Sequence, residues 1–476
     1  MAITEIGANT LDTGYDIENS LRFNSGDSPS LALTFGADGS ATQFCVSMWV
    51  KRSRVTGTQQ FLFSARTDGS NYGTIKFNGD NKIQVNLINS GSDQDEIVTN
   101  EIYRDVSAWY HLFFRFDKTQ AALSNGIKLY VNNVLQTWGT TTYAQNEGYH
   151  FGKSGTPMTI GNYNAAESYA ALYLSEVYYV EGELKNSTDF GEVNDNGVWI
   201  PKAYDGDFGD EGFFLEFKQT GTSQNASGIG ADTSGNTNHF AVTNLAAADV
   251  TTDSPTNNWC TLNPLSDLNA TLSEGNTQLV RNASSAVAAV ATMAPANGKW
   301  YYEFQLSANN NAAAGVVDVD KWDSTTDVYD YDDSGAVAVL IESSDNFIVD
   351  YTEDTAGGTR LQNSVDLNTA KYGFAVDLDN QGFYASANGN WYTGSAFDDT
   401  DFSNATNLAN DIPAGTSMAF FARGSIASAS YANFGNPGGA DSISSGNSDA
   451  NGYGNFEYAV PSGYYALCTK NLAEYG

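Results

Sequence analysis

The chain has 476 residues, more than one hydrophobic core usually organises, so two to three domains are expected. Asp and Glu number 56 against 22 Lys and Arg, and the formal net charge of -34 repels the phosphates of nucleic acids. No apolar run is long enough to span a bilayer, and Cys45, Cys260 and Cys468 lack the spacing of a disulfide framework or a zinc site. We therefore expect no nucleic-acid partner, no membrane insertion and three buried thiols.

The composition favours many short strands joined by turns, because aromatic residues make up 13% and charged residues only 16%. In residues 44–51 apolar side chains alternate with others, and the same period recurs at residues 112–116 and 127–131. Asn132 and Asn133 follow, and because Asn tolerates positive φ they predict a tight hairpin turn. These patterns predict antiparallel sheets with one polar face.

The alternation is lost in the middle of the chain. Residues 220–264 are rich in Gly, Ser, Asn and Thr and contain Pro, which predicts a long loop-rich connector. The connector is expected to join a first domain at residues 1–219 to a second domain at residues 265–476. Alternation restarts at residues 300–306 and 372–376, so the second domain is again expected to be built of antiparallel strands.

Shorter segments of the second half predict one more strand and two hairpin turns. Residues 285–293 have some helix propensity from Ala, but the spacing of Val favours a strand. Gln381 with Gly382, and Asn388 with Gly389, predict further hairpin turns.

The residue types that usually perform catalysis are scattered. His111, His150 and His239 show no ligand or triad spacing, so we interpret them as strand or loop residues. Glu181 and Glu183 are the nearest carboxylate pair for glycoside hydrolysis, which needs two carboxylates on one face about 5 Å apart. They follow a predicted strand in a turn, which favours a solvated loop instead. We expect a protein that is not an enzyme.

Two acidic clusters suit a calcium ion. Asp205, Asp207 and Asp210 place carboxylates at short spacing between Gly residues, as in a calcium loop, but without its final bidentate Glu. An exposed acidic turn is the alternative, and the favoured one. The run at residues 327–333 is open to the same two interpretations. No other cofactor is expected.

Aromatic residues of the second half are candidates for ligand binding. Trp322 precedes Tyr329 and Tyr331, which alternate with Asp in a predicted loop, and Trp391 and Tyr392 follow a predicted turn. Exposed rings beside hydrogen-bonding acids suit both sugars and protein partners. The alternative is that these rings cap the core or contact a neighbouring subunit, because aromatic side chains are mostly buried.

A set of segments in the first part of the chain has the order and spacing of a known family. These segments are residues 21–24, 44–51, 109–112, 128–132, 160–161 and 174–179. As a set they resemble the laminin-G-like or concanavalin-A-like jelly-roll family. The resemblance implies a domain that binds glycan or protein, although the family also includes glycoside hydrolases.

A second set of segments resembles another family. These segments are residues 298–303, 372–379, 383–388, 433–435 and 461–467. They are similar to a SPRY domain, which implies a bent β-sandwich that recognises proteins through its loops and performs no known chemistry. The chain is therefore expected to be all-β, with two antiparallel β-sandwich (jelly-roll) domains joined by the connector.

Residues 204–214, 232–236 and 253–258 lie between and beside these two likenesses. They are similar to tail-fibre-like virion proteins of bacteriophages, which join the same two modules. The amino terminus has neither a basic start nor an apolar segment, so no signal peptide is expected. The resemblance implies location in the virion, a homotrimer, and two kinds of partner, namely host cell-surface polysaccharide or receptor and other virion proteins.

The leading functional hypothesis is a non-enzymatic phage virion protein that adheres to glycan on the host surface. Many copies acting together turn weak single-site binding into firm attachment. The alternative is a structural virion component, such as a capsid decoration, tail nozzle or fibre-joining protein, that makes mainly protein contacts. An envelope-degrading glycosidase is a third hypothesis.

Overall fold

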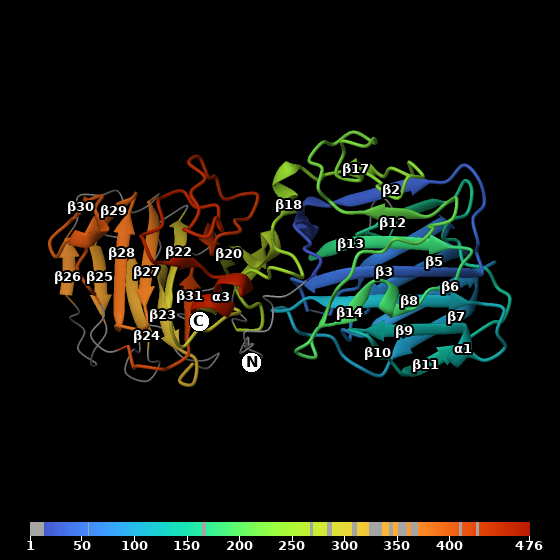
Figure 1. The fold of residues 1–476 in the computed structure, drawn as a ribbon, viewed down its shortest axis with the longest axis horizontal. Helices are drawn as coiled ribbons and strands as arrows, with labels where there is room; N and C mark the ends of the chain where they lie inside the picture. Colours follow the sequence, from blue (N-terminus) through green and yellow to red (C-terminus); the bar gives the residue numbers. More distant parts are fainter. Residues whose placement is uncertain are drawn as a thin grey trace. The chain divides into compact units, whose positions relative to one another are not determined.

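The computed structural model describes residues 14–55, 57–163, 168–266, 270–282, 288–306, 312–322, 336–341, 346–350, 359–362, 370–408, 412–424 and 428–476 (Figure 1). The chain divides into two compact units, with the boundary between Asn257 and Asn258. We call the described residues before this boundary the first unit and those after it the second unit. Strands dominate both units, and the described α-helices are α1 (Leu123–Gly126) and α3 (Thr469–Tyr475), so the predicted all-β fold is confirmed. No helix within these ranges is long and apolar enough to cross a membrane.

The first unit contains two large antiparallel sheets, which we name after strands β3 and β5. The β3 sheet consists, in spatial order, of β10 (Val134–Leu135), β9 (Ile127–Val131), β8 (Tyr110–Asp117), β3 (Gln43–Arg52), β13 (Leu172–Glu181), β1 (Ser20–Phe23) and β18 (Val250–Thr251), with β16 (Phe213–Leu215) paired to β13. The β5 sheet consists of β11 (Trp138–Thr142), β7 (Ser92–Thr99), β6 (Ile83–Asn89), β5 (Asn71–Phe77), β4 (Gln60–Asp68), β12 (Pro157–Ile160), β2 (Ser30–Thr34) and β17 (Ala241–Thr243). A separate hairpin pairs β14 (Gly191–Val193) with β15 (Trp199–Pro201).

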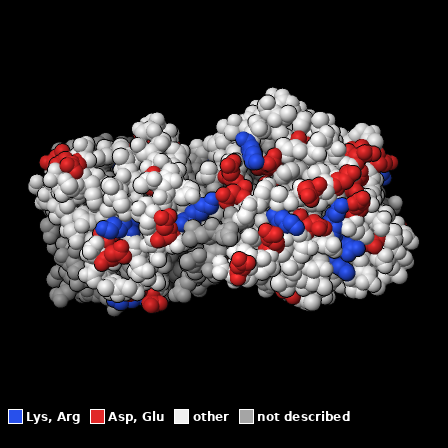
Figure 2. Space-filling model, viewed as in Figure 1, with Lys and Arg blue, Asp and Glu red and all other residues white. Residues whose placement is uncertain are grey.

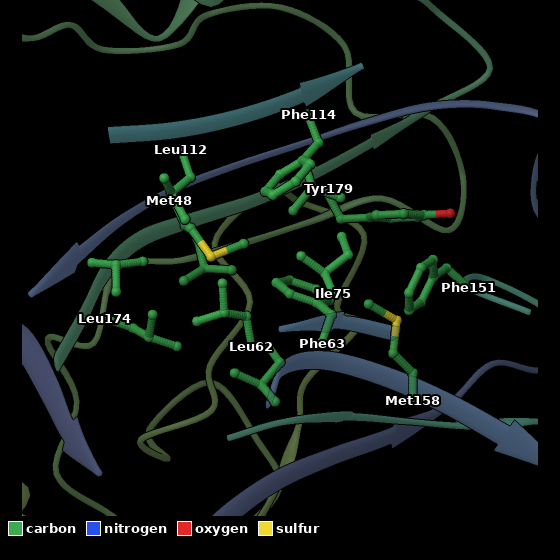
Figure 3. Packing of buried hydrophobic residues seen from close by; sticks show 14 of the residues in the cluster. Met48, Leu62, Phe63, Ile75, Leu112, Phe114, Phe151, Met158, Leu174 and Tyr179 are labelled. Carbon is green, nitrogen blue, oxygen red and sulfur yellow. The ribbon is translucent and has the colours of Figure 1, made fainter. Parts of the chain in front are cut away.

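One hydrophobic core joins the inner faces of these sheets (Figure 3). Met48 and Leu112 of the β3 sheet and Leu62 and Ile75 of the β5 sheet belong to it, and each is fully buried. Each such side chain stabilises the fold by roughly 1.5–3 kcal/mol through removal of apolar surface from water. The alternation read from the sequence at residues 44–51 correctly predicts which side chains face this core.

The predicted polar outer face of the β3 sheet is wrong. The alternate side chains of strand β3, including Cys45, Trp49 and Lys51, are also buried. They lie under a layer of chain that includes Phe190 and Trp199, which pack in small clusters outside the main core. A tertiary cover of this kind leaves no signal in the alternation of a single strand. We call this outer face of the β3 sheet the covered face.

The predicted hairpin turn between β9 and β10 is confirmed. Asn132 and Asn133 have φ angles of 46° and 65°, and Val131 pairs directly with Val134. Positive φ at both central residues matches the right-handed twist of the flanking strands. The same chemistry forms the turn at Asn388 between two strands of the second unit.

Residues 220–257 were predicted as part of a connector, but they pack onto the first unit. Strand β17 pairs with β2 and β18 pairs with β1, while Phe240 is fully buried in the core. The carboxylate of Asp253 accepts a hydrogen bond of 2.7 Å from the buried ammonium of Lys51. A few apolar and acidic residues, such as Phe240 and Asp253, hold this polar segment against the first unit. The composition of the segment does not predict these contacts.

The second unit contains two further antiparallel sheets. One consists of β19 (Ala270–Ser273), β20 (Gln278–Arg281), β32 (Ala429–Asn433), β22 (Lys299–Leu306), β27 (Lys371–Asp377), β28 (Gly382–Ala387), β29 (Asn390–Tyr392) and β30 (Phe397–Asp399), with β33 (Tyr465–Ala466) parallel to β22. The other consists of β21 (Ala289–Val290), β31 (Met418–Arg423), β23 (Ala312–Asp318), β24 (Ala336–Ile341), β25 (Asn346–Asp350) and β26 (Thr359–Gln362). Strand β21 confirms the predicted strand at residues 285–293 where that segment is described.

Short helical turns and buried polar contacts complete both units. The 3-10 helices are η1 (Ser25–Asp27), η2 (Ser187–Asp189), η3 (Ala247–Asp249), η4 (Glu274–Asn276) and η5 (Phe402–Asn404). In the second unit the buried carboxylate of Glu303 accepts hydrogen bonds of 2.9 and 2.8 Å from the backbone N–H groups of Glu457 and Tyr458. The long loop after β32 is thereby tied to the sheet.

Candidate functional site

A pocket of about 880 Å³ lies in the first unit beside strands β4 and β5. Tyr72 and Lys76 of β5 line it. The odd-numbered neighbours Ile75 and Phe77 on the same strand point into the core. Because successive side chains of a strand point to opposite faces, the pocket is on the outer face of the β5 sheet. We call it the β5 pocket.

Aromatic rings form one wall of the β5 pocket. The ring of Tyr163, in the segment after β12, lies 4.8 Å from the ring of Phe61 and 5.6 Å from that of Tyr72, measured between centroids. Tyr163 and Tyr72 are half-buried, so part of each ring faces the pocket. The guanidinium of Arg66 lies 4.9 Å from the centroid of Tyr163 and helps to hold that ring in place.

Two cationic side chains, Arg54 and Lys76, line the same pocket. Lys76 Nζ lies 5.2 Å from the ring centroid of Phe61 and donates a hydrogen bond of 2.9 Å to Gln59 Oε1. Arg54 Nη2 donates to Ser25 Oγ. Partial burial lowers the pKa of both groups, and for Lys76 the charge of Glu96 opposes this effect.

The charge of this pocket differs from that of the chain as a whole. Figure 2 shows Asp and Glu scattered over the visible faces of both units, with Lys and Arg among them. The described residues that line the β5 pocket include no Asp or Glu. Within the described part of the chain, neither Arg54 nor Lys76 has a carboxylate within ion-pair distance. The pocket is therefore a basic and aromatic site in an acidic protein.

A second pocket, of about 480 Å³, lies in the loops at one end of the β5 sheet. His150 Nε2 lies 2.8 Å from Asn89 Oδ1, and Asn89 Nδ2 donates to Glu147 Oε2 at 2.9 Å. The polar groups here bind one another, and acidic and basic residues are mixed. This pocket offers a ligand fewer available groups than the β5 pocket.

The three described aromatic residues among those proposed from the sequence are buried. Trp322, Trp391 and Tyr392 are only 6%, 5% and 3% exposed, so the expectation of exposed rings is wrong for them. They pack in the hydrophobic clusters of the second unit, as the alternative interpretation held. Tyr329 and Tyr331 lie outside the described residues.

The structure does not gather the proposed calcium ligands. Asp205, Asp207 and Asp210 are exposed, and Asp207 Oδ1 accepts a hydrogen bond of 2.9 Å from the backbone N–H of Gly209. The described residues contain no group of three or more His, Cys, Asp or Glu side chains that could hold a metal ion. The geometry here is that of an exposed acidic turn. The run at residues 327–333 lies outside the described residues.

The two carboxylates considered for hydrolysis have separate roles. Glu181 is the last residue of β13, and its carboxylate accepts hydrogen bonds from the backbone N–H groups of Ser40 at 2.5 Å and Glu211 at 2.9 Å. The side chain of Glu183 is 64% exposed and pairs with Lys185. One group fixes the backbone and the other lies in solvent, so they do not face one substrate.

His111 is a structural residue of the covered face. It is fully buried, its Nδ1 accepts a hydrogen bond of 3.0 Å from Trp199 Nε1, and its Nε2 lies 2.8 Å from Ser47 Oγ. Because an indole N–H can only donate, the neutral ring must hold its proton on Nε2. Burial lowers the pKa of His111 to about 3.

Residues of the β5 pocket were not selected from the sequence. Tyr72, Thr74 and Lys76 alternate with Gly73 and Ile75, which is the pattern of a strand with a polar, aromatic outer face. This pattern could have identified the pocket side of β5. Tyr163 could not be found in this way, because it comes to the pocket from a segment far away in the chain.

Comparison with known proteins supports the fold of the first unit. Residues 25–188 match the family model described as the concanavalin A-like lectin/glucanases superfamily, Laminin_G_3. The matched segment is a concanavalin A-like jelly-roll domain, and it contains all the described residues that line the β5 pocket. Comparison with curated protein sequences gives no match of significance.

Solved structures show distant similarity. A SAP-like pentraxin from Limulus polyphemus is 16% identical, with 35% of this chain and 77% of that chain covered and a TM-score of 0.26. Domain 4 of the extracellular arabinanase AbnA from Geobacillus stearothermophilus, in complex with arabinotriose, is 22% identical over 31% of this chain and 64% of that chain, with a TM-score of 0.23. Domains LG4-5 of the mouse laminin alpha1 chain are 9% identical over 87% and 85%, with a TM-score of 0.30.

Proposed function

We propose that the first unit binds carbohydrate in the β5 pocket. The observation that supports this proposal is the combination, on a lectin-type sandwich, of the rings of Tyr72 and Tyr163 with the hydrogen-bonding groups of Gln59, Arg54 and Lys76. Ligand sites typically pair an apolar or aromatic surface with a few polar groups that fix orientation. Sugars have both an apolar ring face and hydroxyl groups, so they suit such a wall.

Binding without cleavage fits the composition of this pocket. Glycoside hydrolysis by the usual route requires two carboxyl groups on either side of the scissile bond. The described lining residues supply none, and Glu181 and Glu183 serve other purposes. The proposed activity is therefore recognition.

The test is a glycan array probed with the full chain and two variants. Tyr163→Ala removes the central ring of the wall, and Gly57→Trp fills the pocket while leaving its side chains in place. A Cβ at Gly57 meets no atom closer than 3.9 Å, so a side chain can begin there without a clash at its Cβ. Tyr130→Ala, a half-buried tyrosine on β9 outside the pocket, is the matched control.

We expect the wild-type chain and the control to bind the same glycans, and both pocket variants to bind at least about tenfold more weakly, which corresponds to about 1.4 kcal/mol. Equal melting temperatures of the variants and the control establish that each variant is folded. Wild-type affinity in both pocket variants would place the binding site elsewhere, and absence of glycan binding by the wild-type chain would remove the proposal.

We also propose that the chain acts on the surface of a bacteriophage particle, where it attaches to polysaccharide of the host cell. The support is the sequence similarity to tail-fibre-like virion proteins and the SPRY-like pattern of the second unit, which stays a prediction. Labelled protein should bind host cells and their extracted polysaccharide without releasing shorter products. If it does not bind, and particles without it assemble poorly, the structural virion role becomes the better explanation.

A further inference from the structure

We infer that the β5 pocket selects an anionic saccharide, one that bears a carboxylate or a sulfate or phosphate ester, and that Arg54 and Lys76 hold the charged group. This inference rests on the proposed carbohydrate binding and specifies its ligand. It follows from the charge, the donor geometry and the position of the two cations relative to the aromatic wall.

The charge of the pocket is opposite to that of the chain. Asp and Glu outnumber Lys and Arg by 56 to 22, yet two cations and no described carboxylate line this pocket. A cation that is partly removed from water and has no described carboxylate within ion-pair distance loses solvation energy, which an anionic ligand restores; Glu96 acts on Lys76 only from beyond that distance. A neutral sugar needs only hydroxyl and amide partners and gives no reason for this arrangement.

Both cations have donors available for a ligand. The guanidinium of Arg54 has five N–H donors in a planar fork, and the hydrogen bond to Ser25 Oγ uses Nη2. The ammonium of Lys76 has three donors, of which Gln59 Oε1 accepts one. Arg binds carboxylate, sulfate and phosphate oxygens in pairs, and such charge-assisted bonds are about twice as strong as neutral ones.

The aromatic wall and Lys76 are adjacent, and Arg54 lines the same pocket. Lys76 Nζ lies 5.2 Å from the ring centroid of Phe61, and Phe61 lies 4.8 Å from Tyr163. A sugar ring that packs on Tyr163 or Tyr72 therefore has Lys76 within reach of a substituent. The wall selects a saccharide over a bare anion, and the cations select a charged saccharide over a neutral one.

The experiment uses the full chain and an array of neutral, uronate-containing, sialylated, sulfated and phosphorylated oligosaccharides. The strongest anionic ligand is then measured by calorimetry beside its carboxyl-reduced, desulfated or dephosphorylated counterpart. Lys76→Gln and Arg54→Gln each remove one cation of the pocket. Lys128→Gln, on β9 outside the pocket, changes the net charge equally and is the matched control.

We expect the anionic form to bind at least about tenfold more tightly than its neutral counterpart, and each pocket variant to remove most of that difference. The control is expected to retain it. If Arg54→Gln proves unstable, Lys76→Gln gives the same comparison because its side chain is half-buried on a strand surface.

Three other outcomes overturn the inference, and they are distinguishable. Binding of neutral oligosaccharides alone refutes the anionic ligand but leaves carbohydrate binding at this pocket intact. Competition by inorganic phosphate or sulfate at the concentrations at which the saccharide binds identifies a site for a small anion instead. No binding of any oligosaccharide refutes the proposed function together with the inference.

Discussion

The two outer faces of the first sandwich differ, although alternating strands build both. The covered face of the β3 sheet buries Lys51, His111 and Glu176 beneath other parts of the chain. The outer face of the β5 sheet leaves Tyr72 and Lys76 half-buried around a pocket. Lys51, His111 and Glu176 are each bonded to other side chains of the protein itself. The polar groups on the second face have donors available for a ligand, and the proposed recognition site is on that face.

The largest expected effect comes from breaking the ion pair of the covered face. Asp253→Ala removes the carboxylate that pairs with the buried ammonium of Lys51 at 2.7 Å and that accepts a 3.1 Å hydrogen bond from Trp109 Nε1. We expect a loss of about 3–5 kcal/mol in the free energy of unfolding, measured in urea. Asp205→Ala, at an exposed carboxylate, is the control and should change it by less than about 0.5 kcal/mol. A small loss in Asp253→Ala would mean that water reaches Lys51.

Glu176 makes the stability of the first unit fall as the pH rises from about 4.5 to about 7. It lies at a bulge of β13 with a φ of 50°, and it accepts hydrogen bonds from the hydroxyls of Tyr178 and Tyr15. Burial, together with the charge of Glu216, raises its pKa to about 7.

Because this pKa is raised, the contribution of Glu176 is complete below about pH 4.5 and is lost as the pH rises through about 7, a change of about 3 kcal/mol. Glu176→Gln should therefore be more stable than wild type at pH 8 by a similar amount and equal to it near pH 4.5. The same substitution at exposed Glu183 is the control and should give no such difference. Parallel pH profiles for wild type and Glu176→Gln would contradict this assignment.

His111 acts in the opposite direction. Its pKa is lowered to about 3, so its contribution is complete above about pH 6.5 and is lost as the pH falls toward 3. Between pH 7.5 and 5 we expect the wild type to lose about 2 kcal/mol that a His111→Gln variant does not lose. The ring proton signals of His111 should not shift over this range in NMR spectra. A titration near pH 6.5 would show that the ring is solvated.

The smallest effect on stability is expected on the β5 face. Tyr72→Ala removes a half-buried ring from the pocket wall, so glycan affinity should fall about tenfold while the melting temperature changes by only a few degrees. Parallel calorimetry and thermal denaturation measure the two quantities. A large loss of stability with unchanged glycan affinity would show that Tyr72 has a structural role, as the residues of the covered face do, and would contradict its role in binding.

Much of the secondary structure could be predicted because it depends on local pattern. Alternation placed Phe44 and Val46 on the core side of β3, and Asn132 with Asn133 identified a hairpin from their tolerance of positive φ. The family resemblance of the first part of the chain agrees with the match over residues 25–188. These properties need only near neighbours or an ordered set of strands.

The site could not be predicted in the same way. Trp322 and Trp391 were chosen because aromatic residues beside acids suit ligands, but burial depends on what packs over them. The β5 pocket takes Arg54, Lys76 and Tyr163 from three separate segments, and the pairing of β4 with both β5 and β12 brings these segments together. Contacts between segments that are far apart in the sequence leave no periodic pattern in any one segment, so they cannot be predicted from such a pattern.

The sequence by itself determined that this protein is built of antiparallel strands, that it is strongly acidic, and that its first part is of the concanavalin A-like type. Only the tertiary structure decided which strand faces are covered. Alternation assigns Cys45 and Trp49 to one face and Phe44 to the other, but it does not say what lies over either. The cover comes from residues more than a hundred positions away, such as Phe190 and Trp199, so it depends on long-range packing.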